Sequence, residues 1–532
     1  MAPLSRALVF TGFMGAGKSS AAVEVARACG GEVLDTDRLL EAQLGHSIAR
    51  EFELHGEAAF RAREEQLVCE LLAQAGAGVV IALGGGAVLS ARVREALAPH
   101  LTVLLEIDST CAWERVQKDV NPARPTERPL ARDPDAFAAL YADRRGLYEG
   151  LADAILPAER LGVAVRALPA LRMLAALPRG GAAERPRLLW ASAASAEYPV
   201  LVGRGLLQAL AREGCWPLDR AASRPFCVTD ETVGELYVKQ LGEMAASIAI
   251  PPGESAKTLA TAERVWRELA HGGMTRADHL AALGGGVVGD LAGFCAATYQ
   301  RGVPVVQIPT TLVAQVDSAY GGKTGVDLPE AKNYVGAYHQ PAAVLVDPDT
   351  LGTLPPAELS AGWVEVLKTA LIAGGELWER VCAEAPGVPP GERTILACAR
   401  LKLAVVAEDE RDGARRQVLN LGHTVGHAIE TATGYGRYRH GEAVGLGLLA
   451  ALRLSGREQL RAQVRELLGA RRLPVALEGA SVDAVVAAVA HDKKRVGAAA
   501  TPFVLVHAPG DVRVGCEVAE QDLRASIAEL FA

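Results

Sequence analysis

The sequence predicts an α/β protein of several domains that ends in a helical domain. The chain has 532 residues, which at about 150 residues per domain corresponds to three or four domains. Short apolar runs alternate with segments of helical spacing, a pattern typical of parallel sheets. From about Pro355 long segments rich in Ala, Leu, Glu and Arg dominate, and these predict helices.

The composition is that of a globular protein that does not bind nucleic acid. Apolar residues make up 50% and charged residues 22% of the chain, so disorder is not expected. The 55 Lys and Arg against 63 Asp and Glu give a net charge of −8, and aromatic residues are only 5%. Nucleic-acid binding would need a basic face.

The cysteines and the apolar runs indicate a reducing compartment. The nine cysteines are widely spaced and include no CxxC, which argues against a disulfide framework. No run approaches the roughly 18 apolar residues of a membrane span. The apolar start of the chain is interrupted by glycines and Lys18, so we expect a cytoplasmic protein without a signal peptide or membrane contact.

The first predicted strand, ALVF, leads into a phosphate-binding loop. Gly12–Ser19 fits GxxxxGK[ST] and precedes a helical segment, so its backbone N–H groups would cradle phosphate. In such a loop Lys18 reaches the terminal phosphates and Ser19 binds Mg²⁺. The predicted ATP-binding residues here are Gly12, Gly15, Ala16, Gly17, Lys18, Ser19 and Ser20.

Further polar residues follow the next predicted strands. Asp35 and Asp37 come after GEVL, where they could hold Mg²⁺ and accept substrate hydroxyls; alternatively, Asp37 is only a helix N-cap. The triplet Gly84–Gly86 ends another strand and would let a small substrate touch the backbone. Arg128 lies in a loop rich in Pro and Arg that suits a mobile lid.

Residues 5–165 resemble shikimate kinase in the phrases TGFMGAGKSS, DTDRLLE, GEAAFRAREE, ALGGGAV, RPL and RRGLYEGLAD. The resemblance implies a P-loop kinase fold, a parallel sheet with helices on both faces. It implies that Asp37 activates the attacking hydroxyl, that Asp35 supports Mg²⁺, and that Lys18 and Arg128 act at the phosphoryl groups. The implied shikimate-binding residues are Asp37, Arg61, Gly85, Gly86 and Arg144.

The rest of the chain divides into a linker and two further domains. We expect the kinase-like domain at 1–170, a linker at 171–187 around PRGGAAERPR, an α/β domain at 188–354 and a helical domain at 355–532. Alternatively, 162–176 is a last strand and helix of the first domain. LLWASAASAEYPVLVGRG alternates as antiparallel strands do, whereas FCVTD and HLAALGGG predict parallel strands that end in ligand loops.

Two patterns in this second half point to ligands. The glycine loop Gly284–Gly289 ends a strand and opens a helix, as pyrophosphate loops do, although a plain turn would look the same. His423 and His427 share a helical face, and His440 follows, so a zinc site is predicted. Glu365 in an apolar helix is a further candidate ligand, or else the partner of Lys368 in a salt bridge.

Residues 188–525 resemble 3-dehydroquinate synthase, most clearly in LGGGVVGDLAGFCAATYQRG, QIPTTLVAQVDSAYGGKTGVD and LNLGHTVGHAIE. The resemblance implies a Rossmann-like NAD domain followed by an all-helical metal domain. It implies that Glu365, His423 and His440 bind Zn²⁺ or Co²⁺ and that His427 is catalytic beside the leaving phosphate. The implied NAD-binding residues are Asp230, Glu254, Lys257, Gly285, Gly286, Asp290, Thr310, Thr311, Lys323, Lys332, Thr353 and Glu358.

The same resemblance implies the substrate site and the reaction. Bound NAD⁺ oxidises a hydroxyl of 3-deoxy-D-arabino-heptulosonate 7-phosphate, phosphate is eliminated, the hydride returns, and an aldol closure gives 3-dehydroquinate. A homodimer through the synthase half is implied as well. The substrate-binding residues would be Arg301, Lys332, Asn333, Lys368, Arg416, Asn420, His427, Lys493 and Lys494, and the catalytic residues His427, Lys323, Asp317, Lys368, Arg416 and Asn420.

Together these patterns predict a bifunctional enzyme that phosphorylates shikimate with ATP and Mg²⁺ and makes 3-dehydroquinate with NAD⁺ and zinc. One alternative keeps the kinase but makes the second half another sugar-phosphate cyclase or a metal-dependent polyol dehydrogenase. Another makes one half a binding or regulatory module without turnover. Asp412 stands where a Glu is common in the synthase family, and we expect this to alter contacts without loss of activity.

Overall fold

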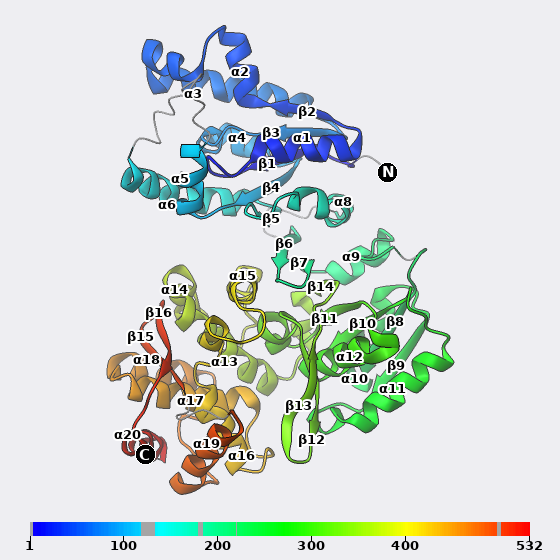
Figure 1. The fold of residues 1–532 in the computed structure, drawn as a ribbon, viewed down its shortest axis with the longest axis vertical. Coiled ribbons are helices and arrows are strands. Elements are labelled where there is room, and N and C mark those ends of the chain that lie inside the picture. The colour runs from blue at the N-terminus through cyan, green and yellow to red at the C-terminus, as the bar shows by residue number, and fades with distance from the viewer. Residues whose placement is uncertain (1–3, 119–132, 179–184, 220, 497–501, 532) are drawn as a thin grey trace. The chain divides into compact units, whose positions relative to one another are not determined.

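The computed structural model describes residues 4–118, 133–178, 185–219, 221–496 and 502–531, with the side chains of 331 and 492–496 left out. The chain forms two compact units (Figure 1). The first comprises Met1–Trp190, Tyr198–Leu201 and Arg212–Pro217, and the second comprises Ala191–Glu197, Val202–Ala211 and Leu218–Ala532.

The first unit is built on a sheet in the order β2-β3-β1-β4-β5-β6-β7. The pairs from β2 to β6 are parallel, with Val9 opposite Ile81 and Thr102. The strand bounds are β1 Leu8–Thr11, β2 Glu32–Asp35, β3 Val79–Ala82, β4 Leu101–Glu106, β5 Ala154–Pro157, β6 Arg187–Ser192 and β7 Glu197–Val202. The predicted strands ALVF, GEVL, GVVIALGGG and LTVLLEI are confirmed as β1, β2, β3 and β4, and the carboxyl ends of the parallel strands meet at one edge of the sheet.

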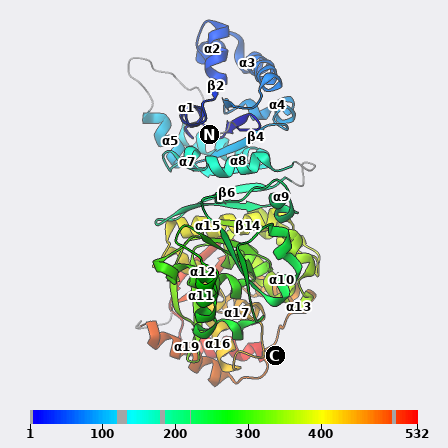
Figure 2. The same cartoon turned by 90° about the vertical axis from the view of Figure 1, so that its right-hand side faces the viewer.

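Helices cover both faces of this sheet, as predicted (Figure 2). They are α1 Lys18–Cys29, α2 Thr36–Leu44, α3 Ile48–Gln74, α4 Ala91–Ala96, α5 Ser109–Lys118, α6 Pro134–Leu151, α7 Val163–Arg166 and α8 Leu168–Ala176, with a 3₁₀ turn, η1 Ala87–Leu89. The N-cap of α2 is Asp35, whose side chain accepts from the N–H of Arg38 at 3.2 Å. The alternative that made Asp37 the N-cap is therefore wrong.

The stretch between β5 and β6 differs from its prediction. The described part of 162–176 forms two short helices, α7 and α8, and no strand. Ser5 Oγ donates to Ala175 O at 3.1 Å and Arg6 Nη2 donates to Leu177 O at 3.0 Å, which ties α8 to the start of the chain. The predicted linker thus begins inside a packed helix, and its residues 179–184 lie outside the described part of the chain.

The second unit opens with a parallel sheet in the order β14-β11-β10-β8-β9. Its strands are β8 Pro225–Asp230, β9 Ala246–Ile250, β10 His279–Gly284, β11 Val305–Pro309 and β14 Ala343–Val346, and a separate hairpin joins β12 Lys323–Leu328 to β13 Ala331–Tyr338. The core packs Val228 and Leu280 from the sheet against Leu269 and Leu291 from two covering helices. FCVTD and HLAALGGG are confirmed as strands β8 and β10.

The helices of this part are α9 Leu206–Arg212, α10 Glu231–Tyr237, α11 Leu259–His271 and α12 Gly286–Thr298. Short turns join them: η2 Val238–Leu241, η3 Glu254–Ala256, η4 Tyr299–Arg301 and η6 Pro348–Thr353. The segment η5, Ala314–Ser318, is a π-helix, a rare conformation that is frequent at functional sites.

The remainder is mainly helical, as predicted, but not entirely so. Its helices are α13 Pro356–Ala373, α14 Gly375–Ala383, α15 Glu392–Glu408, η7 Arg415–Asn420, α16 His423–Ala432, α17 His440–Leu454, α18 Glu458–Ala470, α19 Val482–Val496, α20 Glu520–Ala528 and η8 Glu529–Phe531. The prediction of an all-helical domain is corrected by an antiparallel hairpin of β15 Phe503–Ala508 and β16 Asp511–Cys516. Its turn lies against the end of α13, where the N–H of Gly510 donates to Leu371 O at 2.9 Å.

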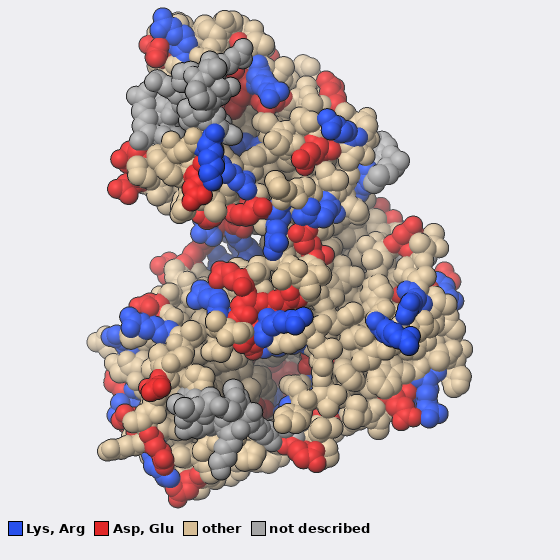
Figure 3. All heavy atoms as spheres, in the orientation of Figure 1, with Lys and Arg blue, Asp and Glu red and all other residues tan. Residues whose placement is uncertain are grey.

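The surface agrees with the charge balance of the sequence. Figure 3 shows Lys and Arg side chains interspersed with Asp and Glu over the face that it draws. Among the described residues, none of the helices has the length and apolar character needed to cross a membrane.

Candidate active sites

The phosphate-binding loop joins β1 to α1 and depends on its glycines. Gly15 and Gly17 have φ values of 81° and 83°, in the left-handed region that favours glycine. A Cβ on Gly15 would lie only 2.7 Å from Ala112 O. Lys18 Nζ donates to the carbonyl oxygens of Gly12 and Phe13 at 2.9 and 3.1 Å, so its charge is held over the loop.

A cavity of about 1150 Å³ joins this loop to the substrate residues predicted from sequence. Gly12 begins the loop but does not line the cavity, and Arg128 lies outside the described residues. The cavity-lining residues that the sequence predicted are Gly15, Ala16, Gly17, Lys18, Ser19, Ser20, Asp35, Asp37, Arg61, Gly85, Gly86 and Arg144.

The wall of this cavity contains an ion pair between Arg61 and Glu64. Arg61 lines it beside Gly86, and a Cβ on Gly86 would collide with the guanidinium. Sequence reasoning missed Glu64, which is 4% exposed and holds Arg61 Nη1 at 2.6 Å. Burial raises the pKa of Glu64, and the adjacent Arg61 opposes that rise. The i, i+3 spacing of Arg61 and Glu64 was the available signal.

The glycine triplet after β3 is anchored on both sides. The N–H of Gly84 donates to Thr36 Oγ1 at 2.8 Å, and Tyr148 Oη donates to Gly85 O at 2.6 Å. Burial raises the pKa of Tyr148 to about 12, so this phenol stays protonated and keeps donating. A Cβ on Gly84 would lie 2.5 Å from Asp37 Oδ1, so the strand end and Asp37 require a small residue here.

The cavity is also lined by the loop after β5 and by α5. Arg115 Nη2 donates to Ala158 O at 3.0 Å and its Nη1 to Gly15 O at 3.4 Å, which links the two loops. Arg160 and Leu161 also line the cavity. Sequence reasoning did not place these residues, although a loop at the carboxyl end of β5 must open toward the same sheet edge as the phosphate loop.

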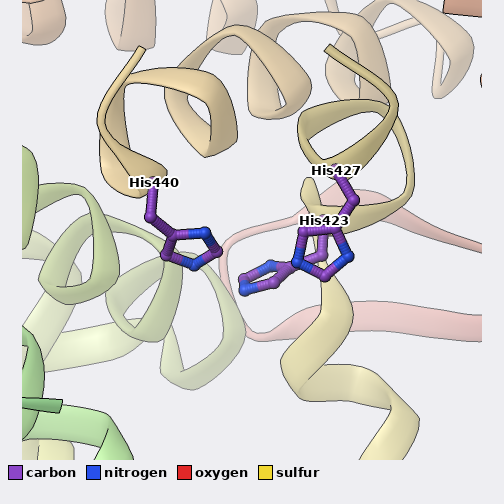
Figure 4. A group of neighbouring side chains, drawn as sticks. All are labelled: His423, His427 and His440. Atoms are coloured by element: carbon purple, nitrogen blue, oxygen red, sulfur yellow. The ribbon is translucent and has the colours of Figure 1, made fainter. Parts of the chain in front are cut away.

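The second unit gathers three histidines. His423 and His427 lie on α16 and His440 begins α17, and one ring nitrogen of each lies within 4.8 Å of the others (Figure 4). The two helices approach closely because glycines line their crossing. A Cβ on Gly426 would lie 3.1 Å from Val444 Cα. This close approach brings His440 beside the histidine pair.

Glu365 from α13 completes the cluster and is 1% exposed. Its Oε1 lies 3.7 Å from His423 Nε2 and 3.6 Å from His440 Nε2. Donor atoms around one tetrahedral zinc ion lie about 3.3–3.5 Å apart, so this set fits a metal. Glu365 Oε2 is also 2.5 Å from Lys368 Nζ, so the alternative, a salt bridge, is present as well.

The charges in this cluster are strongly perturbed. Burial and the neighbouring Lys368 hold the pKa of His423 well below its usual range, which leaves a neutral imidazole. Burial also acts to lower the pKa of His440, but hydrogen bonds to Glu365 and Glu430 raise it to about 10. A metal ion would have to displace that proton, since only a neutral imidazole coordinates.

The glycine loop between β10 and α12 forms a cradle of the kind that a dinucleotide occupies. A Cβ on Gly285 would lie 2.8 Å from Thr311 Cγ2, and one on Gly286 would lie 3.2 Å from Ser318 Oγ. Thr310 Oγ1 is buried with no hydrogen-bond partner among the described residues, so it can serve a ligand. Both features fit NAD.

An acidic and basic pair borders the cradle. Lys257 is 3% exposed and lies 2.6 Å from Asp290 and 3.7 Å from Glu254. Asp230, at the end of β8, caps α10 by accepting from the N–H of Val233 at 2.9 Å. Glu254 and Lys257 lie in and directly after the turn that follows β9, and Asp290 lies on α12, which follows β10. All four predicted residues therefore lie at or shortly after the carboxyl ends of strands of the parallel sheet.

A buried acid–base cluster lies next to the metal-ligand candidates. Asp317, on the π-helix η5, lies 2.8 Å from Lys402 and 3.8 Å from Lys368. The two lysines outweigh burial and lower the pKa of Asp317 to about 2. Sequence reasoning missed Lys402, a buried charge on α15, because this helix carries several other charged residues and nothing in its sequence singles out Lys402.

Two predicted residues of the β12–β13 hairpin contact residues of the helical part. Lys323 lies 2.5 Å from Asp412, and Lys332 lies 3.2 Å from Glu430. Arg416 is 2% exposed, and its guanidinium donates to the carbonyl oxygens of Gly321 and Glu410. The carbonyl contacts fix the plane of the Arg416 guanidinium.

The remaining predicted residues lie on β13, α13 and α19 and at the ends of three short turns. Asn333 has φ 55° and donates its N–H to Asp327 at 2.7 Å. Thr353 contacts Tyr237 Oη at 2.7 Å, and Glu358 forms an exposed ion pair with Arg439 at 2.7 Å. The other four are Arg301, exposed at the end of η4; Asn420, exposed at the end of η7; and Lys493 and Lys494, on α19 with side chains outside the described part.

Three family models match the chain. The shikimate kinase model matches residues 14–167. The model for the 3-dehydroquinate synthase N-terminal domain matches 247–361, and that for its C-terminal domain matches 362–495.

Individual proteins also match this chain. A 3-dehydroquinate synthase of Symbiobacterium thermophilum is 42% identical over 351 residues, 62% of this chain and 96% of the relative. One of Halorhodospira halophila is 46% identical over 279 residues, 51% of this chain and 78% of the relative. Among solved structures, 2-epi-5-epi-valiolone synthase from Streptomyces hygroscopicus, with NAD⁺ and Zn²⁺ bound, has a TM-score of 0.54 at 28% identity and covers 63% of this chain and 96% of its own.

Proposed function

The chain belongs to the 3-dehydroquinate synthase family and carries a shikimate kinase domain ahead of the synthase, and from this premise we propose which residues perform each reaction. It is a bifunctional enzyme of the shikimate pathway. One unit phosphorylates shikimate with ATP, and the other converts 3-deoxy-D-arabino-heptulosonate 7-phosphate to 3-dehydroquinate and phosphate.

In the kinase unit the cavity holds both substrates. The loop at Gly12–Ser19 and Lys18 bind the phosphates of ATP, and Ser19 and Asp35 hold Mg²⁺, which neutralises phosphate charge. Arg61 and Arg144 bind the shikimate carboxylate, a bidentate partner for guanidinium groups. Asp37 accepts the proton of the attacking hydroxyl.

Three residues support this arrangement. Glu64 holds Arg61 in place, because their 2.6 Å contact is buried. Arg128 approaches the transferring phosphoryl group. Arg115 borders the ATP end of the cavity and is proposed to contact the adenine side.

In the synthase unit, the cradle at Gly285 and Gly286 holds NAD⁺, with Lys257, Asp290, Thr310 and Thr311 around it. Glu365, His423 and His440 hold Zn²⁺ or Co²⁺, and their donor types and spacing fit the ion. A metal held by these three residues would supply Lewis-acid polarisation of the oxygen at the carbon that is oxidised. NAD⁺ held in this cradle would supply reversible hydride transfer and would not be consumed overall.

The charged residues of the unit orient the anionic substrate. Lys323, Lys368 and Arg416 bind its oxygens, while Asn333 and Asn420 add hydrogen bonds. The phosphate lies among Arg301, Lys332, His427 and the lysines of α19, Lys493 or Lys494. Asp317 favours the charged forms of Lys368 and Lys402, since both ammonium groups face its carboxylate, although burial lowers the pKa of Lys402.

The observation that carries this proposal is the placement of Glu365. One oxygen of this buried carboxylate faces two imidazoles, and the other faces Lys368 of the acid–base cluster, so the metal and the anionic substrate can meet there. A polyol dehydrogenase would not need this basic cluster. Another sugar-phosphate cyclase is the second candidate, but the relatives of 42–46% identity are 3-dehydroquinate synthases.

Two wider properties belong to the proposal. We propose a homodimer formed through the synthase half, as the family resemblance implies. We also propose a cytoplasmic location, which fits nine cysteines that are all unpaired in the structure.

The synthase assignment is tested by phosphate release from 3-deoxy-D-arabino-heptulosonate 7-phosphate with NAD⁺, with and without a metal chelator. The expected result is metal-dependent phosphate release equal to the dehydroquinate formed, with no accumulation of NADH. Accumulating NADH without phosphate would instead indicate a dehydrogenase. Phosphate release with a different carbocyclic product would indicate another cyclase.

A further inference from the structure

Glu430 is a buried carboxylate that joins two parts of the synthase site. It lies on α16, is 3% exposed, and follows His423 and His427 at helical spacing on the same face. Its Oε2 lies 3.4 Å from His440 Nδ1 and its Oε1 lies 3.2 Å from Lys332 Nζ. Neither the family resemblance nor the metal-ligand set includes it.

The two nitrogens of His440 face different carboxylates. Nε2 lies 3.6 Å from Glu365 Oε1, within the metal-ligand set, whereas Nδ1 faces Glu430. A carboxylate that accepts the Nδ1–H of an imidazole fixes its tautomer and leaves the lone pair on Nε2. Partners of this kind orient metal-binding histidines and make them more basic.

The second oxygen of Glu430 reaches the β12–β13 hairpin. Lys332, on β13, places its ammonium against Glu430 and 4.9 Å from the ring centroid of Tyr435. Without Glu430 the ammonium would lose this close carboxylate contact and keep the contact with the Tyr435 ring. The same carboxylate therefore touches a metal-ligand candidate and a residue proposed to bind the substrate phosphate.

We propose that Glu430 is a positioning residue that orients His440 for the metal through one oxygen and Lys332 for the substrate through the other. This inference rests on the proposed metal site. A purely structural role, a buried salt bridge with Lys332 that holds the hairpin, would make metal affinity depend on Lys332 as much as on Glu430. The two roles therefore differ in a measurable way.

The test titrates Zn²⁺ alone, against a chromophoric chelator, into the metal-free full-length protein and three variants. Glu430→Gln is expected to weaken zinc binding about 10- to 100-fold, the usual effect of losing such a partner. Lys332→Met is expected to keep the wild-type zinc affinity but to raise the KM for 3-deoxy-D-arabino-heptulosonate 7-phosphate. Glu408→Gln, an exposed carboxylate at the end of α15 that pairs with Arg415, is the matched control and should change neither quantity.

Several outcomes would overturn the proposal. They are wild-type zinc affinity in Glu430→Gln, or an equal loss in Lys332→Met. If Glu430→Gln does not fold, Lys332→Met and Glu430→Asp still decide: the shorter carboxylate should bind zinc less tightly than wild type, and wild-type affinity there would contradict the proposal. A wild-type protein that binds no zinc would overturn the proposed metal site itself, and that result is distinguishable because it precedes any comparison of variants.

Discussion

At the scale of single residues, Asp37 is the group on which the kinase chemistry depends most directly. It lies in the first turn of α2 and lines the cavity that also contains Lys18 and Arg61. The tight fit between its Oδ1 and the strand end at Gly84 fixes its place. A carboxylate held there can take a proton from a hydroxyl of a bound substrate.

Asp37→Asn should therefore lower the kcat for shikimate phosphorylation by about 10²- to 10⁴-fold, the range for general base catalysis. Steady-state ADP formation at varied shikimate concentration measures this. Asp135→Asn, an exposed acidic residue in the first turn of α6, is the control and should keep the wild-type rate. A wild-type kcat in Asp37→Asn would show that another group accepts the proton.

Two of the residues that sequence reasoning missed share one physical feature. Lys402 and Glu430 are buried charges on helices, and their partners Asp317 and Lys332 lie 85 and 98 residues away in the sequence. Such pairs form only once the chain has folded, so no local pattern marks them. Lys18, in contrast, lies within a local motif whose spacing alone indicated phosphate binding, whereas the predicted role of Asp37 came from the family resemblance.

At the scale of elements, the junctions of strand, glycine loop and helix were the most predictable parts. The loop at Gly284–Gly286 requires glycine because Thr311 leaves no space for a side chain at position 285. That close contact was not visible in the sequence, which could only suggest a loop. The contact makes the cradle sensitive to a single methyl group.

Gly285→Ala should weaken NAD⁺ binding about 10- to 100-fold, because overpacking costs about 1–3 kcal/mol. Titration calorimetry of NAD⁺ into the full-length protein measures the effect. Gly391→Ala, at a position with open space and a negative φ of −70°, should bind NAD⁺ as the wild type does. Equal affinity in both variants would place the cofactor elsewhere.

The loop that carries Arg416 depends on Asp409. Its carboxylate accepts the N–H groups of Ala414, Arg416 and Gly413 at 2.7, 3.0 and 2.9 Å, and these bonds lower the pKa of Asp409 to about 2. Because folding lowers this pKa, the stabilisation from the three hydrogen bonds is complete above about pH 4, the pKa of an aspartate in the unfolded chain. It is lost as the pH falls toward about 2.

Asp409→Asn should therefore speed hydrogen exchange at Gly413, Ala414 and Arg416 at neutral pH, since a neutral amide oxygen accepts these bonds less strongly. The difference from wild type should shrink as the pH falls from about 4 to about 2. Exchange followed by mass spectrometry measures both trends. Unchanged exchange at neutral pH would mean that other contacts hold the loop.

The β15–β16 hairpin was the clearest failure at this scale. FVLVHA and DVRVGC alternate and are separated by Pro509 and Gly510, a recognisable turn signal. The prediction instead followed the composition of the surrounding residues, which is rich in helix formers. Similarly, 162–176 was interpreted as a strand and helix, whereas α7 and α8 pack as two short helices.

At the scale of the whole molecule, each unit contains one glycine loop and its own candidate site. The phosphate-binding loop at Gly12–Ser19 belongs to the first unit, and the loop at Gly284–Gly289 belongs to the second. The described residues that line the kinase cavity all belong to the first unit. The histidine cluster, the cradle and the acid–base cluster all belong to the second unit. Length and motifs were sufficient to predict two functions, but which buried side chains serve each site required the three-dimensional structure.

We propose that two complete active sites operate in one chain. The most direct test assays both reactions on the same preparations of wild type, Lys18→Met and His423→Ala. We predict that Lys18→Met loses shikimate phosphorylation and keeps phosphate release from 3-deoxy-D-arabino-heptulosonate 7-phosphate, and that His423→Ala shows the reverse. Loss of both activities in either folded variant, or absence of one activity from the metal-loaded wild type, would contradict the account.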